Sequence, residues 1–214
     1  MQIFQSLKIL LFGILISLFA VTPTWAAEFT KDQHYAVLSQ PQPVDAEKKI
    51  EVRELFWYGC PHCFNLEPIL NAWIKKKPKD VAFVRTPAVL RKDWAPLARA
   101  FYTFEALGVT NQLHGKLFDA IHLRKQHLNS ANSIADFAAK NGIDRDKFLN
   151  TYKSFGVDSA FRKAQILGRK YEADGVPTII VDGRYRTTAT MAGSHEQLMQ
   201  VVDFLVNKSR ASKK

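Results

Sequence analysis

The chain of 214 residues carries two cysteines, and both lie in the sequence Cys60-Pro61-His62-Cys63. Thiols separated by two residues can close into a small disulfide, which the thiolate of another protein can open. Two cysteines this close cannot join distant parts of a fold, so a structural crosslink is not expected. The spacing therefore predicts redox chemistry by thiol–disulfide exchange.

Each residue of this motif has an expected role. Pro61 suits the first position of a helix, which places the Cys60 sulfur beside unpaired N–H groups and the positive end of the helix dipole. His62 adds a donor and, when protonated, a positive charge beside the same sulfur. We expect Cys60 to be the exposed nucleophile with a lowered pKa, and Cys63 to be the buried resolving thiol. A stabilised thiolate makes the disulfide a strong oxidant, which favours its donation to substrate thiols.

The motif lies between two predicted strands. Alternating apolar residues predict a strand over residues 50–58. Apolar side chains at helical spacing predict a helix over 61–77, and residues 81–86 predict a second strand. A strand–helix–strand unit takes a right-handed crossover, which makes its two strands parallel. The motif is thus expected at the start of the crossover helix.

The rest of the chain is expected to be mostly helical. The polar residues 28–49 predict an extended segment with room for a short edge strand. Helices are predicted at 94–107, 110–122, 130–140, 144–153, 159–173 and 195–206. Ser130 and Asp144 are expected to cap the helices at 130–140 and 144–153. Residues 175–181 and 185–191 predict strands joined by a hairpin turn at Asp182-Gly183.

The N-terminus has the pattern of a secretory signal peptide, in which Lys8 is followed by an apolar stretch over residues 9–21. Thr24 and Ala26 occupy the two small-residue positions, so we predict cleavage after Ala26 and a signal peptide of residues 1–26. The alternative, an uncleaved membrane anchor, needs roughly 20 apolar residues, more than this stretch supplies. No cysteine lies near the cut, which excludes lipid attachment there. The mature protein is expected to be exported and soluble.

Composition bounds the remaining function classes. The formal net charge is +10, and 47% of the residues are hydrophobic, which suits a packed core in one domain with an insertion or in two small domains. The basic residues are spread along the predicted helices and do not form the dense stripe with interleaved aromatics that nucleic-acid binding favours. We expect a solvated basic surface and no nucleic-acid partner. Attraction to an anionic membrane surface stays open.

A Cys-x-x-Cys pair is also found as half of a zinc site, which needs two further ligands at suitable spacing. The chain has no second cysteine pair, and its histidines are scattered over His34, His62, His114, His122, His127 and His195. No metal is therefore expected.

Glu54 is an acidic residue in an apolar row of the strand predicted at 50–58, so we expect it to be buried. Arg85, on the neighbouring strand, is placed to pair with it beneath the motif, where the pair could influence proton transfer at Cys63. The alternative is a structural ion pair or two solvated strand ends.

Two aromatic segments are expected to lie mainly in the core. One or two residues of the segment Phe56-Trp57-Tyr58 are expected to border a substrate groove next to the motif. The second segment contains Trp94, Phe101, Tyr102 and Phe104. Their spacing favours positions in the core over positions along a groove.

Several motifs together resemble the thioredoxin superfamily. They are the Cys-x-x-Cys that opens a helix after a strand, Pro68 five residues past the second cysteine, and Gly175-Val176-Pro177-Thr178 before a later strand. The sequence Cys-Pro-His-Cys, the export signal and the helical block more specifically resemble the DsbA family of periplasmic thiol:disulfide oxidoreductases. The resemblance covers nearly the whole mature chain.

The resemblance implies an α/β thioredoxin-like fold with an inserted all-helical domain. After the signal peptide, the thioredoxin-like domain is expected to comprise residues 27–90 and 158–214, and the helical domain residues 91–157. The Val176-Pro177 bond is expected to be cis and to pack against the disulfide, and the Val176 backbone to pair with an extended substrate segment.

The resemblance also bears on the predicted ion pair. Glu54 matches an acidic position of the family pattern, whereas Arg85 stands where lysine is expected. Arginine does not release its proton, which argues against a shuttle role for that position.

The resemblance implies that the Cys60–Cys63 disulfide is donated to unfolded exported proteins with free cysteines, in the periplasm. A quinone-coupled inner-membrane oxidase of the DsbB type is expected to restore it, without an organic cofactor or metal. A periplasmic reductase or isomerase is one alternative, although the polar segment before residue 50 is too short for the separate dimerisation domain usual in such isomerases. An exported metal-binding chaperone that uses the two thiols is a second.

Overall fold

The computed structural model describes residues 29–46 and 48–213, so the predicted signal peptide and its cleavage after Ala26 lie outside the described residues. A five-stranded sheet has the order β1-β5-β4-β2-β3. Its strands are β1 (Ala36–Val37), β2 (Ile50–Phe56), β3 (Val81–Pro87), β4 (Thr178–Val181) and β5 (Tyr185–Thr188). In the described part of the chain, no helix is both long and apolar enough to span a bilayer.

The centre of the sheet is the predicted parallel unit. β2 and β3 pair in parallel, with Ile50 opposite Val81, and helix α1 (Pro61–Lys76) makes the crossover between them. β4 pairs with the other side of β2 and is antiparallel to it, as is β5 to β4. The short edge strand β1 continues the sheet beyond β5. The predicted parallel unit, hairpin and edge strand are therefore confirmed.

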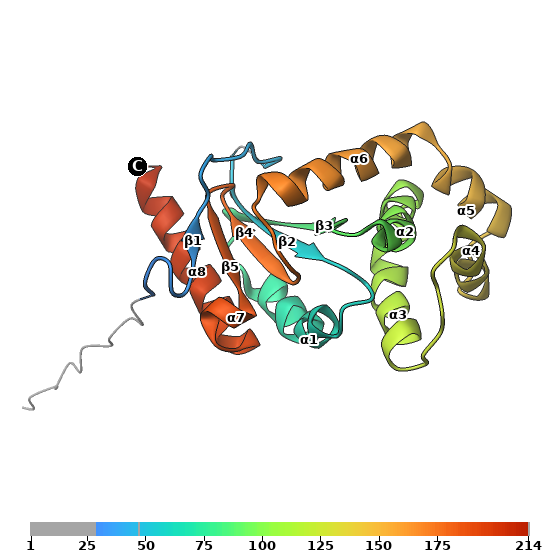
Figure 1. The fold of residues 1–214 in the computed structure, drawn as a ribbon, viewed down its shortest axis with the longest axis horizontal. Helices are drawn as coiled ribbons and strands as arrows, with labels where there is room; N and C mark the ends of the chain where they lie inside the picture. The colour runs from blue at the N-terminus through green and yellow to red at the C-terminus, as the bar shows by residue number, and fades with distance from the viewer. Residues whose placement is uncertain (1–28, 47, 214) are drawn as a thin grey trace, which may run out of the picture.

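Helices cover both faces of the sheet (Figure 1). On one face, α1 and α8 (His195–Ser212) pack apolar residues such as Leu66, Leu70 and Leu205 against β2 and β4. On the other face, α6 (Phe155–Lys170) approaches through Leu167. Alternate residues of each strand face opposite sides, which is why all seven residues of β2 are buried.

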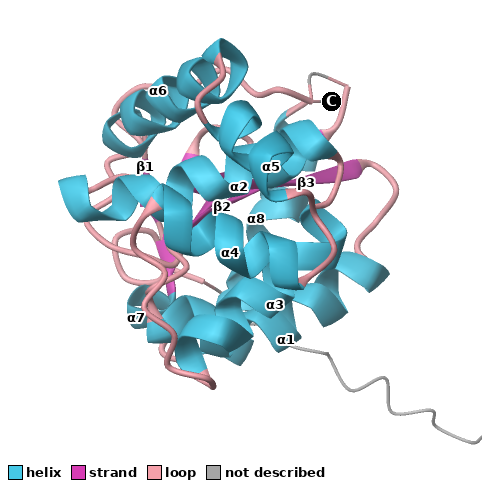
Figure 2. Cartoon of the chain, turned by 90° about the vertical axis from the view of Figure 1, so that its right-hand side faces the viewer, coloured by secondary structure: helices cyan, strands magenta, loops and turns pink. Residues whose placement is uncertain are grey.

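A block of four helices stands beyond one end of the sheet, next to the start of α1 (Figures 1 and 2). It follows a 3-10 turn (Lys92–Trp94) and consists of α2 (Ala95–Leu107), α3 (Thr110–His122), α4 (Ala131–Lys140) and α5 (Arg145–Tyr152). These bounds confirm the predicted helices. Ser130 and Asp144 cap α4 and α5 as predicted, because their side chains accept hydrogen bonds from the first-turn N–H groups of Ser133 and Lys147.

Two helices differ from their predicted bounds. α6 begins at Phe155, earlier than predicted, because the Ser154 hydroxyl accepts a hydrogen bond from the Val157 N–H and caps the helix there. α8 continues past the predicted end to Ser212, and its last turn is held by an ion pair between Arg210 and Asp80 at 2.7 Å. Taken together, the added residues of both helices are mostly polar or small, so apolar periodicity did not predict that the helices extend over them.

The segment after β4 also differs in part. Asp182 and Gly183 both have positive φ (53° and 63°), as a two-residue hairpin requires, and a Cβ on Gly183 would lie 2.1 Å from the carbonyl oxygen of Gln42. The strand predicted to 191 ends at Thr188, whose side chain caps the short helix α7 (Ala189–Ala192). α6 crosses the predicted domain boundary between residues 157 and 158, and the division into domains stays a prediction.

Replacing Ser130 with alanine is expected to lower the free energy of unfolding by about 1 kcal/mol, because it removes the hydroxyl that accepts from the Ser133 N–H. Urea unfolding followed by circular dichroism measures the change. The matched control is Asn132→Ala, an exposed residue in the same turn. Equal losses in the two variants would contradict the capping role.

Candidate active site

The redox motif lies where β2 passes into α1. Cys60 precedes the helix in an extended conformation (φ −87°, ψ 119°), and Pro61 is the first helical residue. Pro61 has no N–H that would need a partner there, so it begins the helix without a cost in hydrogen bonding. Both cysteines are free thiols. The predicted position of the motif at a helix start is confirmed.

The Cys60 thiol is strongly acidified, and its pKa is lowered to about 6. The largest cause is a hydrogen bond from the Cys63 thiol. The backbone N–H groups of Cys63 and His62 and the charge of His62 act in the same direction, against burial, which raises the pKa. At neutral pH Cys60 is therefore mainly a thiolate, the nucleophilic form.

Cys63 has the opposite character. Its side chain is completely buried, and this burial raises its pKa well above the usual value. The hydrogen bond it donates to Cys60 raises the pKa further, as does the charge of Glu54 at a pH where that carboxyl is ionised. Cys63 therefore keeps its proton at neutral pH, as expected for a buried resolving thiol.

Cys60 is less exposed than predicted, since only 7% of the residue remains accessible. The loop before β4 lies against it, with the Val176 carbonyl oxygen 3.4 Å from the sulfur. The bond between Val176 and Pro177 is cis, as predicted. The family resemblance predicted that Val176 and Pro177 pack against the motif, but the exposure expected for Cys60 did not allow for how closely this loop covers the sulfur.

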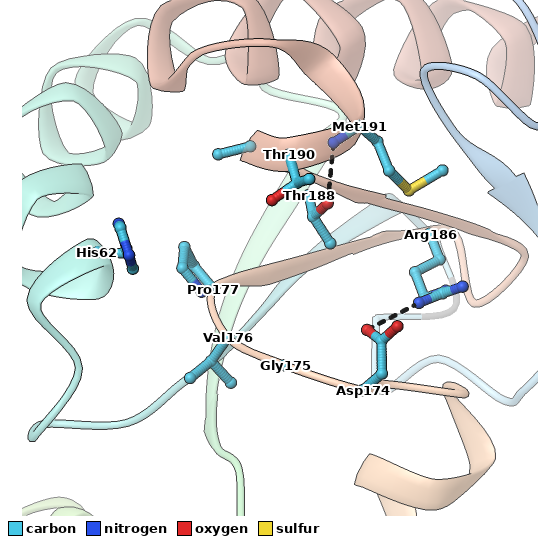
Figure 3. Close-up of a pocket in the computed structure, with 10 residues that line it drawn as sticks. His62, Asp174, Gly175, Val176, Pro177, Arg186, Thr188, Thr190 and Met191 are labelled. Atoms are coloured by element: carbon cyan, nitrogen blue, oxygen red, sulfur yellow. Dashed lines mark hydrogen bonds and ion pairs between the residues drawn. The ribbon is translucent and has the colours of Figure 1, made fainter.

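A groove of about 420 Å³ opens beside the motif (Figure 3). His62 lies at one end of it, and the ion pair between Arg186 and Asp174, at 3.3 Å, lies at the other. The residues that line the groove are His62, Asp174, Gly175, Val176, Pro177, Arg186, Thr188, Ala189, Thr190 and Met191. Mixed polar and apolar walls next to a reactive sulfur suit an extended peptide segment.

Glu54 and Arg85 form the predicted pair beneath the motif. They lie opposite each other in the β2–β3 register, with Arg85 Nε 3.4 Å from Glu54 Oε2. Glu54 is completely buried, and among the described residues no donor reaches hydrogen-bond geometry with either of its oxygens. Burial, followed by the charge of Glu67, raises the pKa of Glu54 to about 8, although Arg85 opposes this. Glu54 is therefore protonated at neutral pH.

Sequence reasoning missed two residues of this buried cluster, Glu67 and His114. Glu67 on α1 accepts hydrogen bonds from Arg85 (3.1 Å) and Asn71 (3.0 Å), and it lies 3.2 Å from His114 Nε2. Glu67 follows Cys63 by four residues, so helical spacing could have placed it on the same side of α1. No comparable signal points to His114, which belongs to the separate helical block.

The aromatic residues before the motif are divided between core and surface. Phe56 and Tyr58 are buried, whereas Trp57 is only partly buried and stacks on Trp94 with ring centroids 4.4 Å apart and planes within 4°. Gly59 permits this arrangement, because a Cβ there would lie 2.3 Å from the Trp57 ring. Trp57 is thus the aromatic of this segment that reaches the surface near the motif.

Helix α3 also holds the backbone of this segment. His122 Nε2 donates a hydrogen bond to the Tyr58 carbonyl oxygen at 2.8 Å, and its ring stacks on Phe64 at 4.9 Å. In the part of the chain that the structure describes, no group of three or more His, Cys, Asp or Glu side chains is arranged to bind a metal ion.

Comparison with known proteins identifies the family. The model of the DSBA-like thioredoxin domain matches residues 85–203. The thiol:disulfide interchange protein DsbA of Pseudomonas aeruginosa is 42% identical over 189 residues, which span 88% of this chain and 90% of that protein. The protein of the same name from Burkholderia cepacia is 40% identical over 84% of this chain and 85% of its own length. The chain belongs to the DsbA family.

Solved structures of the DsbA family agree. The crystal structure of Pseudomonas aeruginosa DsbA superposes with a TM-score of 0.83 at 43% identity, over 87% of this chain and 97% of that one. The DsbA of Xylella fastidiosa gives a TM-score of 0.78 at 34% identity, over 83% and 96% of the two chains. The predicted fold class, thioredoxin-like with an inserted helical domain, is confirmed. The protein is a thiol:disulfide oxidoreductase that forms disulfide bonds, and its family acts through its own disulfide.

The acidified Cys60 predicts a pH-dependent stability of the reduced protein. Its pKa of about 6 in the folded state lies below that of an unfolded cysteine, near 8.5. The resulting stabilisation is complete above about pH 8.5, shrinks as the pH falls and is lost below about pH 6. It amounts to about 3 kcal/mol.

This difference is measured by urea unfolding of the reduced protein between about pH 5 and pH 9. The reduced Cys60→Ser variant is the matched control, because it lacks the thiolate and keeps the other titrating groups. Parallel stability curves for the two proteins would contradict the lowered pKa.

Proposed function

We propose that this DsbA-family enzyme oxidises substrate dithiols by transferring its Cys60–Cys63 disulfide to them. A substrate thiolate attacks the Cys60 sulfur, the bond between the two cysteines breaks, and Cys63 leaves with the electron pair. A second substrate thiolate then attacks the substrate sulfur of the mixed disulfide, and Cys60 leaves as a thiolate. The observation that supports this direction most is the acidified Cys60, because a stable leaving thiolate makes the disulfide oxidising.

The proton balance of the transfer assigns a role to Glu54. The two substrate thiols release two protons; one is taken up by Cys63, which stays protonated, and one goes to solvent because Cys60 stays a thiolate. Cys63 leaves in a buried position, where an unprotonated sulfur is costly. Glu54 is protonated at neutral pH, and it lies close enough to Cys63 that its ionised form raises the Cys63 pKa, so we assign it the proton that Cys63 receives. Arg85 orients the carboxyl and does not itself exchange a proton.

Substrate binding is assigned to the loop before β4. Val176 and Pro177 lie beside the sulfur, and the groove extends from them towards α7. An extended substrate segment would pair with the Val176 backbone, which brings its cysteine to Cys60. His62 is assigned the stabilisation of the Cys60 thiolate, and Pro61 the start of the helix that supplies its N–H groups.

We place the reaction in the periplasm, with unfolded exported proteins as substrates. The predicted signal peptide and the oxidising character of that compartment support this location. Reoxidation requires attack by the Cys60 thiolate on the disulfide of an oxidant, and resolution by Cys63. We assign that oxidant to a quinone-coupled inner-membrane oxidase of the DsbB type, and no organic cofactor, metal or nucleic acid enters the cycle.

Two variants separate the proposed roles of the cysteines. At neutral pH, reduced Cys63→Ser is expected to form a mixed disulfide with oxidised glutathione at least about a hundredfold faster than reduced Cys60→Ser, because only Cys60 is acidified and Cys63 is completely buried. Mass spectrometry of quenched samples measures the adduct. Both variants are expected to lose catalytic oxidation of a reduced test protein. Similar rates of adduct formation would refute the assignment of Cys60 as the nucleophile.

The equilibrium with glutathione separates an oxidase from a reductase or isomerase. The low pKa of Cys60 predicts a disulfide much more oxidising than that of thioredoxin. A potential close to that of thioredoxin would assign the protein to disulfide reduction instead. Tight stoichiometric binding of zinc or copper by the reduced protein, without oxidation of the test protein, would favour the metal-binding chaperone.

A further inference from the structure

Helix α3 of the helical block places a histidine in the buried cluster beneath the redox motif. His114 is 7% exposed and is surrounded by the rings of Phe56, Phe101 and Phe118. Its two ring nitrogens have different partners: Nδ1 lies 2.8 Å from the Tyr58 hydroxyl, and Nε2 lies 3.2 Å from Glu67 Oε1. The imidazole therefore connects the segment before the motif to the helix that carries Cys63.

One assignment of protons satisfies this chain of contacts. The Tyr58 hydroxyl can donate to Nδ1, and the Nε2–H of a neutral His114 can then donate to Glu67. An ionised Glu67 accepts from His114, Arg85 and Asn71 together, whereas a protonated one would add an O–H donor to a site that already contains three donors. Burial raises the pKa of Glu67, but the hydrogen bonds from His114 and Asn71 and the charge of Arg85 act against it, and this pKa lies below its usual value. Burial likewise lowers the pKa of His114, which favours the neutral imidazole.

The second carboxyl of the cluster lacks such support. In the part of the chain that the structure describes, the cation paired with Glu54 is Arg85, whose Nε lies 3.4 Å away and outside hydrogen-bond geometry. Nη2 of the same arginine contacts Glu67 and Asn71. Two buried carboxylates that share one cation do not both ionise readily. The better-supported carboxyl takes the charge, and the other keeps the proton.

We propose that His114 is a positioning residue of the redox centre, which fixes the charge on Glu67 by donating to it and thereby leaves the proton of the cluster on Glu54. This inference rests on the proposed role of Glu54 as the group that supplies a proton to Cys63. By this inference the helical block does more than cover the motif: through His114 it determines which carboxyl of the buried cluster is charged.

The groups that face His114 come from every neighbouring element. They are Tyr58 after β2, Glu67 in α1 and Arg85 in β3. Glu54 in β2 and Glu105 in α2 act on Tyr58 through their charge. Burial raises the pKa of Glu105, and its charge, when present, raises the pKa of Tyr58 and keeps that hydroxyl protonated. Arg85 is the permanent cation among these groups and lies beside both carboxyls, whereas His114 contacts Glu67 alone of the two.

His114→Leu removes the donor, whereas His114→Gln keeps a neutral N–H at the same reach along the side chain and serves as the matched control. Without the donor, Glu67 takes up the proton and Arg85 turns to Glu54, so the titration of Glu54 is expected to move down from about 8 by at least about one pH unit, a tenfold loss in proton affinity. The glutamine variant is expected to titrate like the unchanged protein. The carboxyl carbon signals of Glu54 and Glu67 in reduced protein measure both titrations by NMR.

The unchanged protein tests the same inference even where a variant fails to fold. At neutral pH its Glu67 signal is expected to be that of a carboxylate and its Glu54 signal that of an acid. A protonated Glu67, or equal titrations in the leucine and glutamine variants, would overturn the role of His114. A Glu54→Gln variant that leaves the pH profile of dithiol oxidation unchanged would instead overturn the proposed role of Glu54, whichever carboxyl holds the proton.

Discussion

The chemistry depends on how two identical thiols on one turn of α1 come to differ. Cys60, just before the helix, accepts hydrogen bonds from the Cys63 thiol and from the first N–H groups of α1, which lowers its pKa to about 6. Cys63 is enclosed, and burial raises its pKa. One sulfur is therefore stable as an anion and the other as a thiol. This difference makes the bond between them reactive towards a third thiol.

Cys63 lies in the apolar cluster that the helical block shares with the residues around the motif. Both cysteines belong to the same apolar cluster as Phe101, Phe104 and Phe118, and not to the cluster between the sheet and α8. A low-dielectric environment on this side penalises charge on any buried group, which is why Cys63 and Glu54 have raised pKa values together. The inserted helices thus supply the environment that the thioredoxin-like part needs for its redox centre.

Local patterns predicted the parts of this site that follow one another in the chain: the motif at a helix start, the parallel unit, the helix caps and the hairpin at Asp182. Contacts between segments that are distant in the sequence were harder to predict. The row of apolar residues placed Glu54 inside, but periodicity could not tell that His114, 47 residues after Glu67, would meet it. The stacking of Trp57 on Trp94 likewise depends on which faces pack together, which a single sequence does not specify. The packing of Val176 beside Cys60 was expected from the family resemblance and not from any local pattern.

Arg85 shows why the charges of the cluster can be divided as they are. Its planar guanidinium presents several donors, so Nη2 contacts Glu67 and Asn71 while Nε remains beside Glu54. A lysine would offer one compact charge and a proton that burial could remove. Because arginine keeps its proton, the cluster contains one fixed positive charge and is neutral when only one carboxyl ionises. A neutral cluster adds no repulsion to the thiolate above it, whereas a second carboxylate would oppose the low pKa of Cys60 on which the oxidising disulfide depends.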